Sequence, residues 1–228
     1  MPYNEVFFVN YPYYNIANGM SDIKLPVGHA GVMMKDRNGK YKYFEYGVYT
    51  DHIYGKAKPD NMQGNWRSID LNSSDLDSAA QELLKFQGNA AGSEVRITPA
   101  DSNPRDVIRA IDKHAYDVNR PNYRIAGTGI NNCGSNATDV INAGLKPETK
   151  LTNKLRSAFK RVVTTPFLGL PELIMGKGVT SNAVLGVAGA LMGAPRTAQL
   201  LNIVLGENTT NDFESQFSGR STRVFKRK

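Results

Sequence analysis

The chain has 228 residues, of which 40% are hydrophobic and 21% charged, and its formal net charge is +7. This length and composition are sufficient for a hydrophobic core without disulfides, and they argue against a disordered or fibrous protein. The single cysteine excludes an internal disulfide. The basic charge favours an anionic partner, such as a cell-wall polymer, an anionic lipid or a nucleic acid.

Two segments bear on targeting. Residues 1–15, MPYNEVFFVNYPYYN, lack a basic start and a long apolar run, so we expect no secretory signal peptide. Residues 178–195 carry no charge, but Gly, Ser, Thr, Asn and Pro interrupt them, and a membrane span needs about 20 apolar residues. The segment therefore predicts a buried or interfacial helix.

Strands dominate the first part of the chain. Residues 5–13, EVFFVNYPY, are rich in β-branched and aromatic residues and predict a strand. Residues 28–49 predict a hairpin, because two stretches with strand character flank the turn sequence DRNG at 36–39. Residues 51–67 are expected to form a loop, followed by a further strand at 66–71.

Helices and one more strand follow. Residues 73–88 and 103–118 predict amphipathic helices, with a short strand at 94–100 between them. After Cys133 the apolar residues again recur at helical spacing, so a third helix begins at or within one residue of Cys133. Because strands and helices are mixed rather than regularly alternating, the expected fold class is α+β.

The character of the chain changes near residue 150, where strand patterns give way to helical or irregular, Gly/Ala-rich sequence. We therefore expect a first domain over residues 1–149. Residues 150–228 are expected to form a helical appendage with a basic tail, GRSTRVFKRK. A basic tail of this kind is most often a solvated chain end.

Cys133 is the first candidate for chemistry. A lone cysteine is usually an inert small hydrophobe. At a helix N-terminus, however, unpaired N–H groups and the helix dipole favour the thiolate, and the backbone N–H of Cys133 can bind an oxyanion. A nearby histidine can then accept the thiol proton.

Three histidines are available as the base. His114 lies on a predicted helix beside its apolar stripe, which indicates a surface or boundary role. His52 lies in a predicted loop. His29 is the preferred base, because it opens a predicted strand between the small residues Gly28 and Ala30, which leave space for a substrate.

A family resemblance rests on two stretches, VGHAGVMMKDRNGKYKYFEYG at 27–47 and NNCGSNATDVINAGL at 131–145. Together they resemble the circularly permuted branch of the NlpC-type papain-like cysteine peptidases and amidases, in which the histidine precedes the cysteine. The resemblance covers about residues 5–146. It implies an antiparallel sheet packed with helices, with Cys133 as nucleophile and His29 as base.

The resemblance also places a third, orienting residue on the second arm of the hairpin. A two-residue turn centred on Asn38 and Gly39 would bring Tyr46 onto the face of His29, whereas a one-residue bulge would bring Glu45 there. A carboxylate is better suited to hold the imidazole tautomer and stabilise the imidazolium. We therefore expect Glu45 in this role, with Tyr46 as the alternative.

The implied activity is hydrolysis of amide bonds in peptidoglycan stem peptides. The pattern is also similar to antibacterial toxins that type VI secretion systems inject into rival bacteria. Such a protein would be made in the cytoplasm without a signal peptide and would act in the periplasm of a target cell. Its expected partners are the peptidoglycan peptide, an immunity protein and a component of the secretion machine.

Two alternatives stay open. A permuted-fold acyltransferase or phospholipase would act on lipid, and the apolar C-terminal segment could then contact a membrane, but Gly134, Ser135 and Asn136 replace the Glu-His-Phe usual in such relatives. A non-enzymatic basic binding module is the other alternative, although no nucleic-acid-reading motif is present.

We expect no cofactor and no metal, because one cysteine and three scattered histidines do not form a metal-binding pattern.

Overall fold

The computed structural model describes residues 3–12, 14–17, 24–26, 28–58, 64–123, 131–146 and 222–228. Its elements are β1 (Tyr3–Tyr11), β2 (Asn15–Ala17), β3 (Lys24–Pro26), β4 (His29–Asp36), β5 (Tyr41–Gly47), β6 (Ile53–Tyr54), β7 (Asn65–Leu71), α1 (Leu76–Phe86), the 3-10 helix η1 (Gly88–Ala91), β8 (Glu94–Ala100), α2 (Pro104–Tyr116), α3 (Cys133–Gly144) and β9 (Arg223–Lys226).

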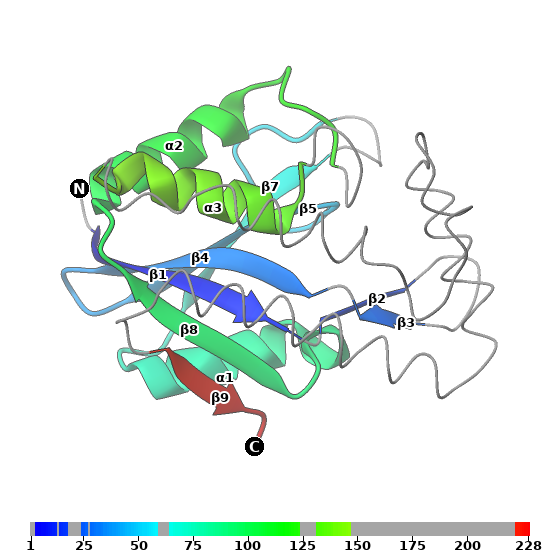
Figure 1. Ribbon diagram of the computed structural model, residues 1–228, viewed down its shortest axis with the longest axis vertical. Helices are drawn as coiled ribbons and strands as arrows, with labels where there is room; N and C mark the ends of the chain where they lie inside the picture. The colour runs from blue at the N-terminus through cyan, green and yellow to red at the C-terminus, as the bar shows by residue number, and fades with distance from the viewer. Residues whose placement is uncertain are drawn as a thin grey trace, which may run out of the picture.

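The structure combines a sheet with helices, which agrees with the predicted α+β class. The main sheet has 7 strands in the order β6-β7-β5-β4-β1-β8-β9, and every pair of neighbours is antiparallel. A separate pair of short strands, β2 and β3, forms within the region between β1 and β4. Helices α2 and α3 lie over one face of the main sheet, and α1 lies over the other (Figure 1).

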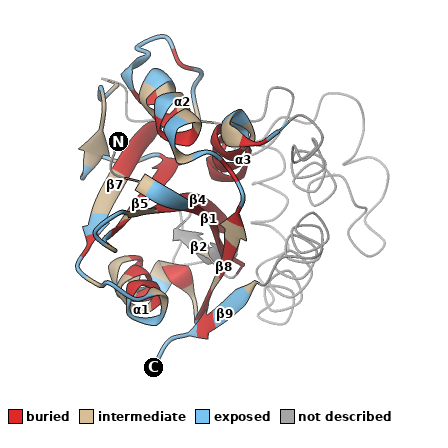
Figure 2. Ribbon diagram, turned by 90° about the vertical axis from the view of Figure 1, so that its left-hand side faces the viewer, coloured by how far each residue is buried: buried red, intermediate tan, exposed pale blue. Residues whose placement is uncertain are grey.

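The sheet therefore separates two hydrophobic cores, and Figure 2 shows buried stretches in the strands and in the helices on both sides of the sheet. On the interior strand β1, Val6 and Phe8 pack toward α2 and α3, whereas Phe7 and Val9 pack toward α1. This alternation follows from the two-residue period of a strand. Because both faces are covered, β1 is apolar along most of its length rather than alternating with polar residues.

The helices begin where the sequence provides capping residues. Asp75 caps α1 by accepting a hydrogen bond from the backbone of Ser78, and Asn103 caps α2 immediately before Pro104. Helix α1 ends at Phe86, and Gly88, which has φ of +54°, opens η1 two residues later. These boundaries agree with the predicted helices to within a few residues.

The turn between β4 and β5 determines which residues share a face. Gly39 has φ of +82°, and Asp36 and Lys40 are joined by a backbone hydrogen bond of 2.8 Å, so the loop comprises three residues. This is one residue more than a two-residue turn centred on Asn38 and Gly39, which is the arrangement of a type I turn with a glycine bulge. As a consequence Gly31 pairs with Glu45.

The last strand, β9, comes from the far end of the chain. It pairs with β8 at the edge of the main sheet (Figure 1). Phe225 is buried in the core beneath α1. Part of the basic tail, expected to be solvated and to belong to an appendage over residues 150–228, thus belongs to the main sheet. The predicted helical, Gly/Ala-rich part of that appendage, including residues 178–195, lies outside the described residues.

Candidate active site

Cys133 is the first residue of α3, as predicted. The preceding residue, Asn132, caps the helix: its side chain accepts from the backbone of Ser135, and the Ser135 side chain accepts from the Asn132 backbone. This reciprocal box fixes the start of the helix and leaves the Cys133 N–H outside the intrahelical ladder. The cysteine is only 3% exposed.

His29 is the first residue of β4 and meets Cys133 at one end of the sheet. The imidazole and the Cys133 thiol lie close enough for each group to shift the pKa of the other. The ring of Tyr14 lies 4.7 Å away between centroids, and the ring of Tyr11 stacks against the imidazole at 6.0 Å. The two aromatic rings therefore pack against an imidazole that β4 positions, and His29 is 5% exposed.

Glu45 lies on β5 and approaches the other side of the imidazole. Its Oε2 accepts a hydrogen bond of 2.5 Å from Nε2 of His29, which leaves Nδ1 as the ring nitrogen available to Cys133. The three-residue turn is the reason, because pairing of Gly31 with Glu45 puts Glu45 and His29 on the same face of the sheet. Cys133, His29 and Glu45 thus form one contiguous chain of interactions.

Glu45 is fully buried, and several donors surround its carboxylate. Tyr43 OH donates at 2.9 Å and Gln87 Nε2 at 2.7 Å, both to Oε2. The guanidinium of Arg67 donates to Oε1 and also holds Gln87, with a bond of 2.9 Å from Nη2 to Gln87 Oε1. The carboxylate therefore has a fixed orientation and a permanent countercharge, as a buried charge requires.

Arg67 is itself held between two aromatic rings. Its Cζ lies 3.8 Å from the ring centroid of Tyr49 and 4.7 Å from that of Phe86. The Tyr49 hydroxyl also lies 3.2 Å from Nε2 of His29. Tyr49 thus contacts both the cation that neutralises Glu45 and the imidazole that Glu45 orients.

The pKa values of the central pair move in opposite directions. Burial alone would raise the pKa of the Cys133 thiol, but the charge and hydrogen bond of His29, with further hydrogen bonds from Ala30 and Tyr123, lower it overall. Burial alone would lower the pKa of His29, but the charges of Cys133 and Glu45 raise it to about 10. A thiolate beside an imidazolium is the ionic form that these shifts favour.

The carboxylate stays ionised beside this pair. Burial alone would raise the pKa of Glu45, but the charge and hydrogen bond of His29, together with those of Arg67, lower it to about 2. A permanently charged Glu45 can hold the proton on Nε2 and stabilise the imidazolium, which is the orienting role of the third member of a catalytic triad.

Tyr46, the alternative third residue, lies on the opposite face of the sheet. Its hydroxyl donates to the carbonyl of Pro121 at 3.1 Å, and its ring packs 5.1 Å from that of His114. His114 accepts a hydrogen bond of 2.9 Å from the indole of Trp66, and its pKa is lowered to about 4 by burial and by the charge of Arg120. His52 is exposed. The structure therefore brings only His29, of the three histidines, to Cys133.

Tyr123 closes the site from the side of the loop before α3. It contributes to the lowered pKa of the Cys133 thiol, and its ring lies 5.8 Å from that of Tyr46.

Sequence reasoning missed Arg67, Gln87, Tyr14, Tyr43 and Tyr49. Arg67 and Gln87 come from a strand and a helix end remote in the sequence from Glu45, and no spacing rule connects them. Tyr43 could have been found, because it stands two residues before Glu45 on one strand and so must share its face.

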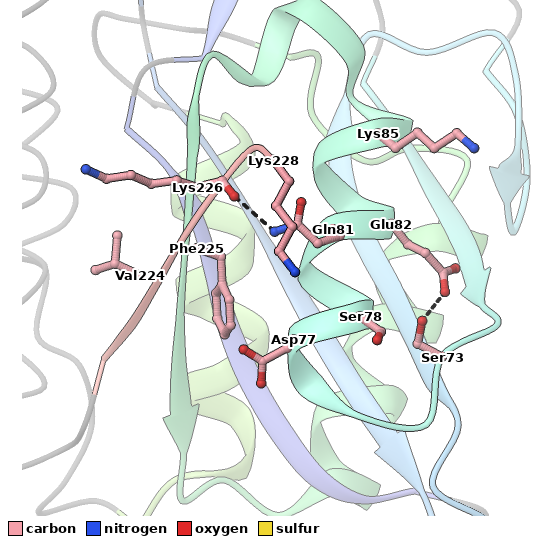
Figure 3. A pocket seen from close by; sticks show the side chains of 10 residues that line it. All are labelled: Ser73, Asp77, Ser78, Gln81, Glu82, Lys85, Val224, Phe225, Lys226 and Lys228. Carbon is pink, nitrogen blue, oxygen red and sulfur yellow. Dashed lines mark hydrogen bonds between the residues drawn. The ribbon is translucent and has the colours of Figure 1, made fainter.

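A surface pocket lies elsewhere, between α1 and β9 (Figure 3). Charged and polar side chains line it, including Asp77, Glu82 and Lys226, and hydrogen bonds join Gln81 to Lys226 and Ser73 to Glu82. None of the residues around Cys133 lines this pocket, so it adds nothing to the chemistry of the thiol.

Within the part of the chain that the structure describes, no cluster of three or more His, Cys, Asp or Glu side chains could hold a metal ion. Over the same residues, no helix combines the length and apolarity that crossing a membrane requires. Comparison with known proteins gives no match to any family model, curated protein or solved structure.

Proposed function

We propose that the chain is a cysteine hydrolase in which Cys133 is the nucleophile, His29 the general base and acid, and Glu45 the orienting carboxylate. One observation carries this proposal: His29 contacts Cys133 on one side and donates to the buried Glu45 carboxylate at 2.5 Å on the other. A nucleophile, a base and an orienting group in this order define a site for acyl transfer.

The mechanism follows from the positions of these groups. The Cys133 thiolate attacks a carbonyl carbon, and the carbonyl oxygen takes the negative charge close to the N–H groups at the start of α3. The His29 imidazolium gives its proton to the leaving amine as the acyl thioester forms. Water then attacks the thioester, His29 takes a proton from that water, and the Cys133 thiolate leaves.

The substrate class rests on the resemblance to permuted NlpC-type papain-like enzymes. We propose amide bonds in peptidoglycan stem peptides as the substrate, and delivery by a secretion system into the periplasm of a rival cell as the route. An immunity protein and a component of the secretion machine would then be partners. The net charge of +7 supports association with an anionic wall polymer.

The buried charges favour this function over that of a binding module. A surface that binds polyanions needs exposed cations, whereas Glu45 and Arg67 are buried as an ion pair beside a histidine and a thiol. Burying charges costs free energy, and perturbed titratable groups that converge on a nucleophile are typical of active sites.

Digestion of purified peptidoglycan tests the proposal, with soluble fragments identified by mass spectrometry. Wild-type protein should release stem-peptide fragments, and Cys133→Ala should release none above background. Cys133→Ser, which keeps the size of the side chain, controls for packing at the start of α3. Equal fragment release by the wild type and Cys133→Ala would overturn the nucleophile assignment, and release of fatty acid from phospholipid in place of peptide would move the substrate to lipid.

A further inference from the structure

Asn10 has a buried hydrogen-bond donor without an acceptor. The side chain is 3% exposed, and among the described residues nothing accepts a hydrogen bond from its Nδ2. A buried amide that forfeits its hydrogen bonds to water costs free energy, and most buried polar groups in folded proteins are paired. An unpaired donor in the resting protein is therefore expected where a ligand supplies the acceptor.

The strand register shows which way Asn10 points. Asn10 on β1 pairs with Ala30 on β4, and paired residues of an antiparallel ladder place their side chains on the same face. Two residues earlier on β1, Phe8 packs in the core beneath α2 and α3, as does Val32 on β4. Because side chains alternate along a strand, Asn10 and Ala30 also lie on the α3 face.

The same end of the sheet carries the nucleophile. Ala30, the partner of Asn10, belongs to the same hydrophobic core as Ala137, which lies one turn after Cys133 in α3. Paired residues in such a ladder are about 5 Å apart, so Asn10 lies beside Ala30 on the face of the sheet that the first turns of α3 cover. In Figure 1 the end of β1, the beginning of β4 and the beginning of α3 lie together.

We infer that Asn10 is a catalytic residue of the proposed hydrolase, whose Nδ2 donates the second hydrogen bond to the oxyanion. The first donor is the backbone N–H of Cys133. This role rests on the proposed function, because an oxyanion exists only if the Cys133 thiolate attacks a carbonyl. It accounts for the unpaired donor, which would find its acceptor only in the transition state, where such a bond lowers the barrier most.

The step balances without any further reactant. The sulfur lone pair forms the C–S bond while the carbonyl π electrons move to oxygen, where Asn10 and the Cys133 N–H stabilise the negative charge. Collapse of this intermediate restores the C=O bond and expels the leaving group, which takes the His29 proton when it is an amine. The product is an acyl thioester on Cys133, and water later hydrolyses it.

Acylation by 4-nitrophenyl acetate tests the role of Asn10 separately from substrate choice. The measurement is the rate of the first, Cys133-dependent burst of 4-nitrophenolate. Asn10→Ala and the near-isosteric Asn10→Leu should both slow this burst. The decrease in rate should approach roughly 10²- to 10³-fold, which is the effect of removing one oxyanion donor. Alkylation of Cys133 by iodoacetamide forms no oxyanion, so its rate should change less than about twofold.

A structural role would give a different pattern. Since Asn10 Nδ2 makes no hydrogen bond in the resting protein, Asn10→Leu should unfold at or above the wild-type temperature. The matched control is Ser102→Ala, which removes a buried hydrogen bond of 2.6 Å to the Ile141 carbonyl near the far end of α3. Ser102→Ala should be less stable and should keep the wild-type burst rate.

The outcomes separate this inference from the proposed function. A wild-type burst that Asn10→Ala and Asn10→Leu retain at full rate overturns the role of Asn10 alone. Equal slowing of acylation and iodoacetamide alkylation also overturns it, because the damage would then lie in the thiolate. The absence of any Cys133-dependent burst in wild type overturns the proposed function, and the role of Asn10 with it.

Discussion

At the scale of single residues, the arrangement around His29 is asymmetric. One ring nitrogen faces a carboxylate that is ionised at any pH above about 2, and the thiol occupies the other side. Glu45 therefore acts on Cys133 only through the imidazole. Removing His29 should change the chemistry of the thiol, whereas removing Glu45 should change the orientation and charge of the base.

The reactivity of Cys133 should depend on pH in a way that reports this pair. Because the pKa of the thiol is lowered and that of His29 is raised to about 10, the thiolate–imidazolium form should persist between these two values. Alkylation by iodoacetamide, followed by intact mass, should therefore reach half its maximum below about pH 8.5, the ordinary value for a thiol. In His29→Ala the midpoint should rise above that value, because only burial and weaker neighbours then act.

His114→Gln serves as the control for this titration. It replaces a half-buried histidine of α2, which bonds Trp66 rather than Cys133, and it retains an acceptor for the Trp66 indole. Its alkylation midpoint should match the wild type. If His29→Ala also matched the wild type, the interaction between His29 and Cys133 would not be the source of the lowered pKa.

Glu45 and Tyr46 are neighbours on β5, which makes them a natural pair for substitution. Glu45→Gln keeps the shape but loses the charge that stabilises the imidazolium, so kcat should fall by roughly 10²- to 10⁴-fold, the range of general acid–base catalysis. Tyr46→Phe removes a hydroxyl that bonds Pro121 on the other face, and kcat should stay within about threefold. Rates of stem-peptide release measure both, and the reverse ranking would contradict the assignment of Glu45.

The sequence was sufficient to predict the candidate residues that the structure brings together, but not the residues that surround them. Cys133 follows an asparagine cap and precedes a helical pattern, so its position was predictable. Choosing Glu45 over Tyr46 required knowing the length of one turn. Arg67 and Gln87 contact Glu45 through tertiary packing alone, and no local pattern marks them.

At the scale of elements, the pairing of β9 with β8 is the contact that the sequence did not predict. The backbone of β9 pairs with β8, the Arg227 backbone donates to Ser93 at 2.9 Å, and Arg223 forms an ion pair with Asp77 on α1. Within β9 (Arg223–Lys226), every residue except Phe225 is exposed. Phe225 is therefore the apolar contact that fixes the strand on the sheet.

Substitution within β9 tests this account. Phe225→Ala should lower the free energy of unfolding by about 3 kcal/mol, the lower end of the range for a large-to-small change in a core, since Phe225 is 7% exposed at the sheet edge. Its neighbour Val224 is 48% exposed, so Val224→Ala should stay within about 0.5 kcal/mol of wild type. Urea unfolding followed by circular dichroism measures both. Equal effects would show that the strand is held by backbone pairing rather than by this side chain.

The predicted elements differ from the observed ones where tertiary contacts decide. Helices α1, α2 and α3 were predictable from their apolar stripes and caps. Strand β6, with residues Ile53 and Tyr54 only, is too short to leave a pattern and pairs with β7 inside a predicted loop. Strand β9 looked like a solvated basic tail, because its one buried residue is surrounded by cations.

At the scale of the whole molecule, the candidate site joins the two sides of the sheet. Cys133 comes from a helix that packs on one face, whereas Glu45, Arg67 and Gln87 belong to the face covered by α1. His29 connects them at the end of β4. The order of the strands thus places the charged residues of the α1 face close to the N-terminus of α3, which packs on the other face.

This network should make the stability of the fold depend on pH. The pKa of Glu45 is about 2 in the folded protein against 4.5 for an unperturbed glutamate, so the folded state binds this proton more weakly than the unfolded state does. The resulting stabilisation is fully present above about pH 4.5 and is lost as the pH falls toward 2. A shift of this size corresponds to about 3 kcal/mol.

Glu45→Gln isolates that contribution. At pH 7 the variant should be less stable than wild type by roughly 3–5 kcal/mol, because Arg67 and the imidazolium then lie buried without their countercharge. The difference should shrink as the pH falls from 4.5 to 2, since the wild-type carboxylate becomes protonated and resembles the amide. Urea unfolding at several pH values measures both curves. If the two curves stayed parallel throughout this window, Glu45 would not be the carboxylate whose ionisation stabilises the fold.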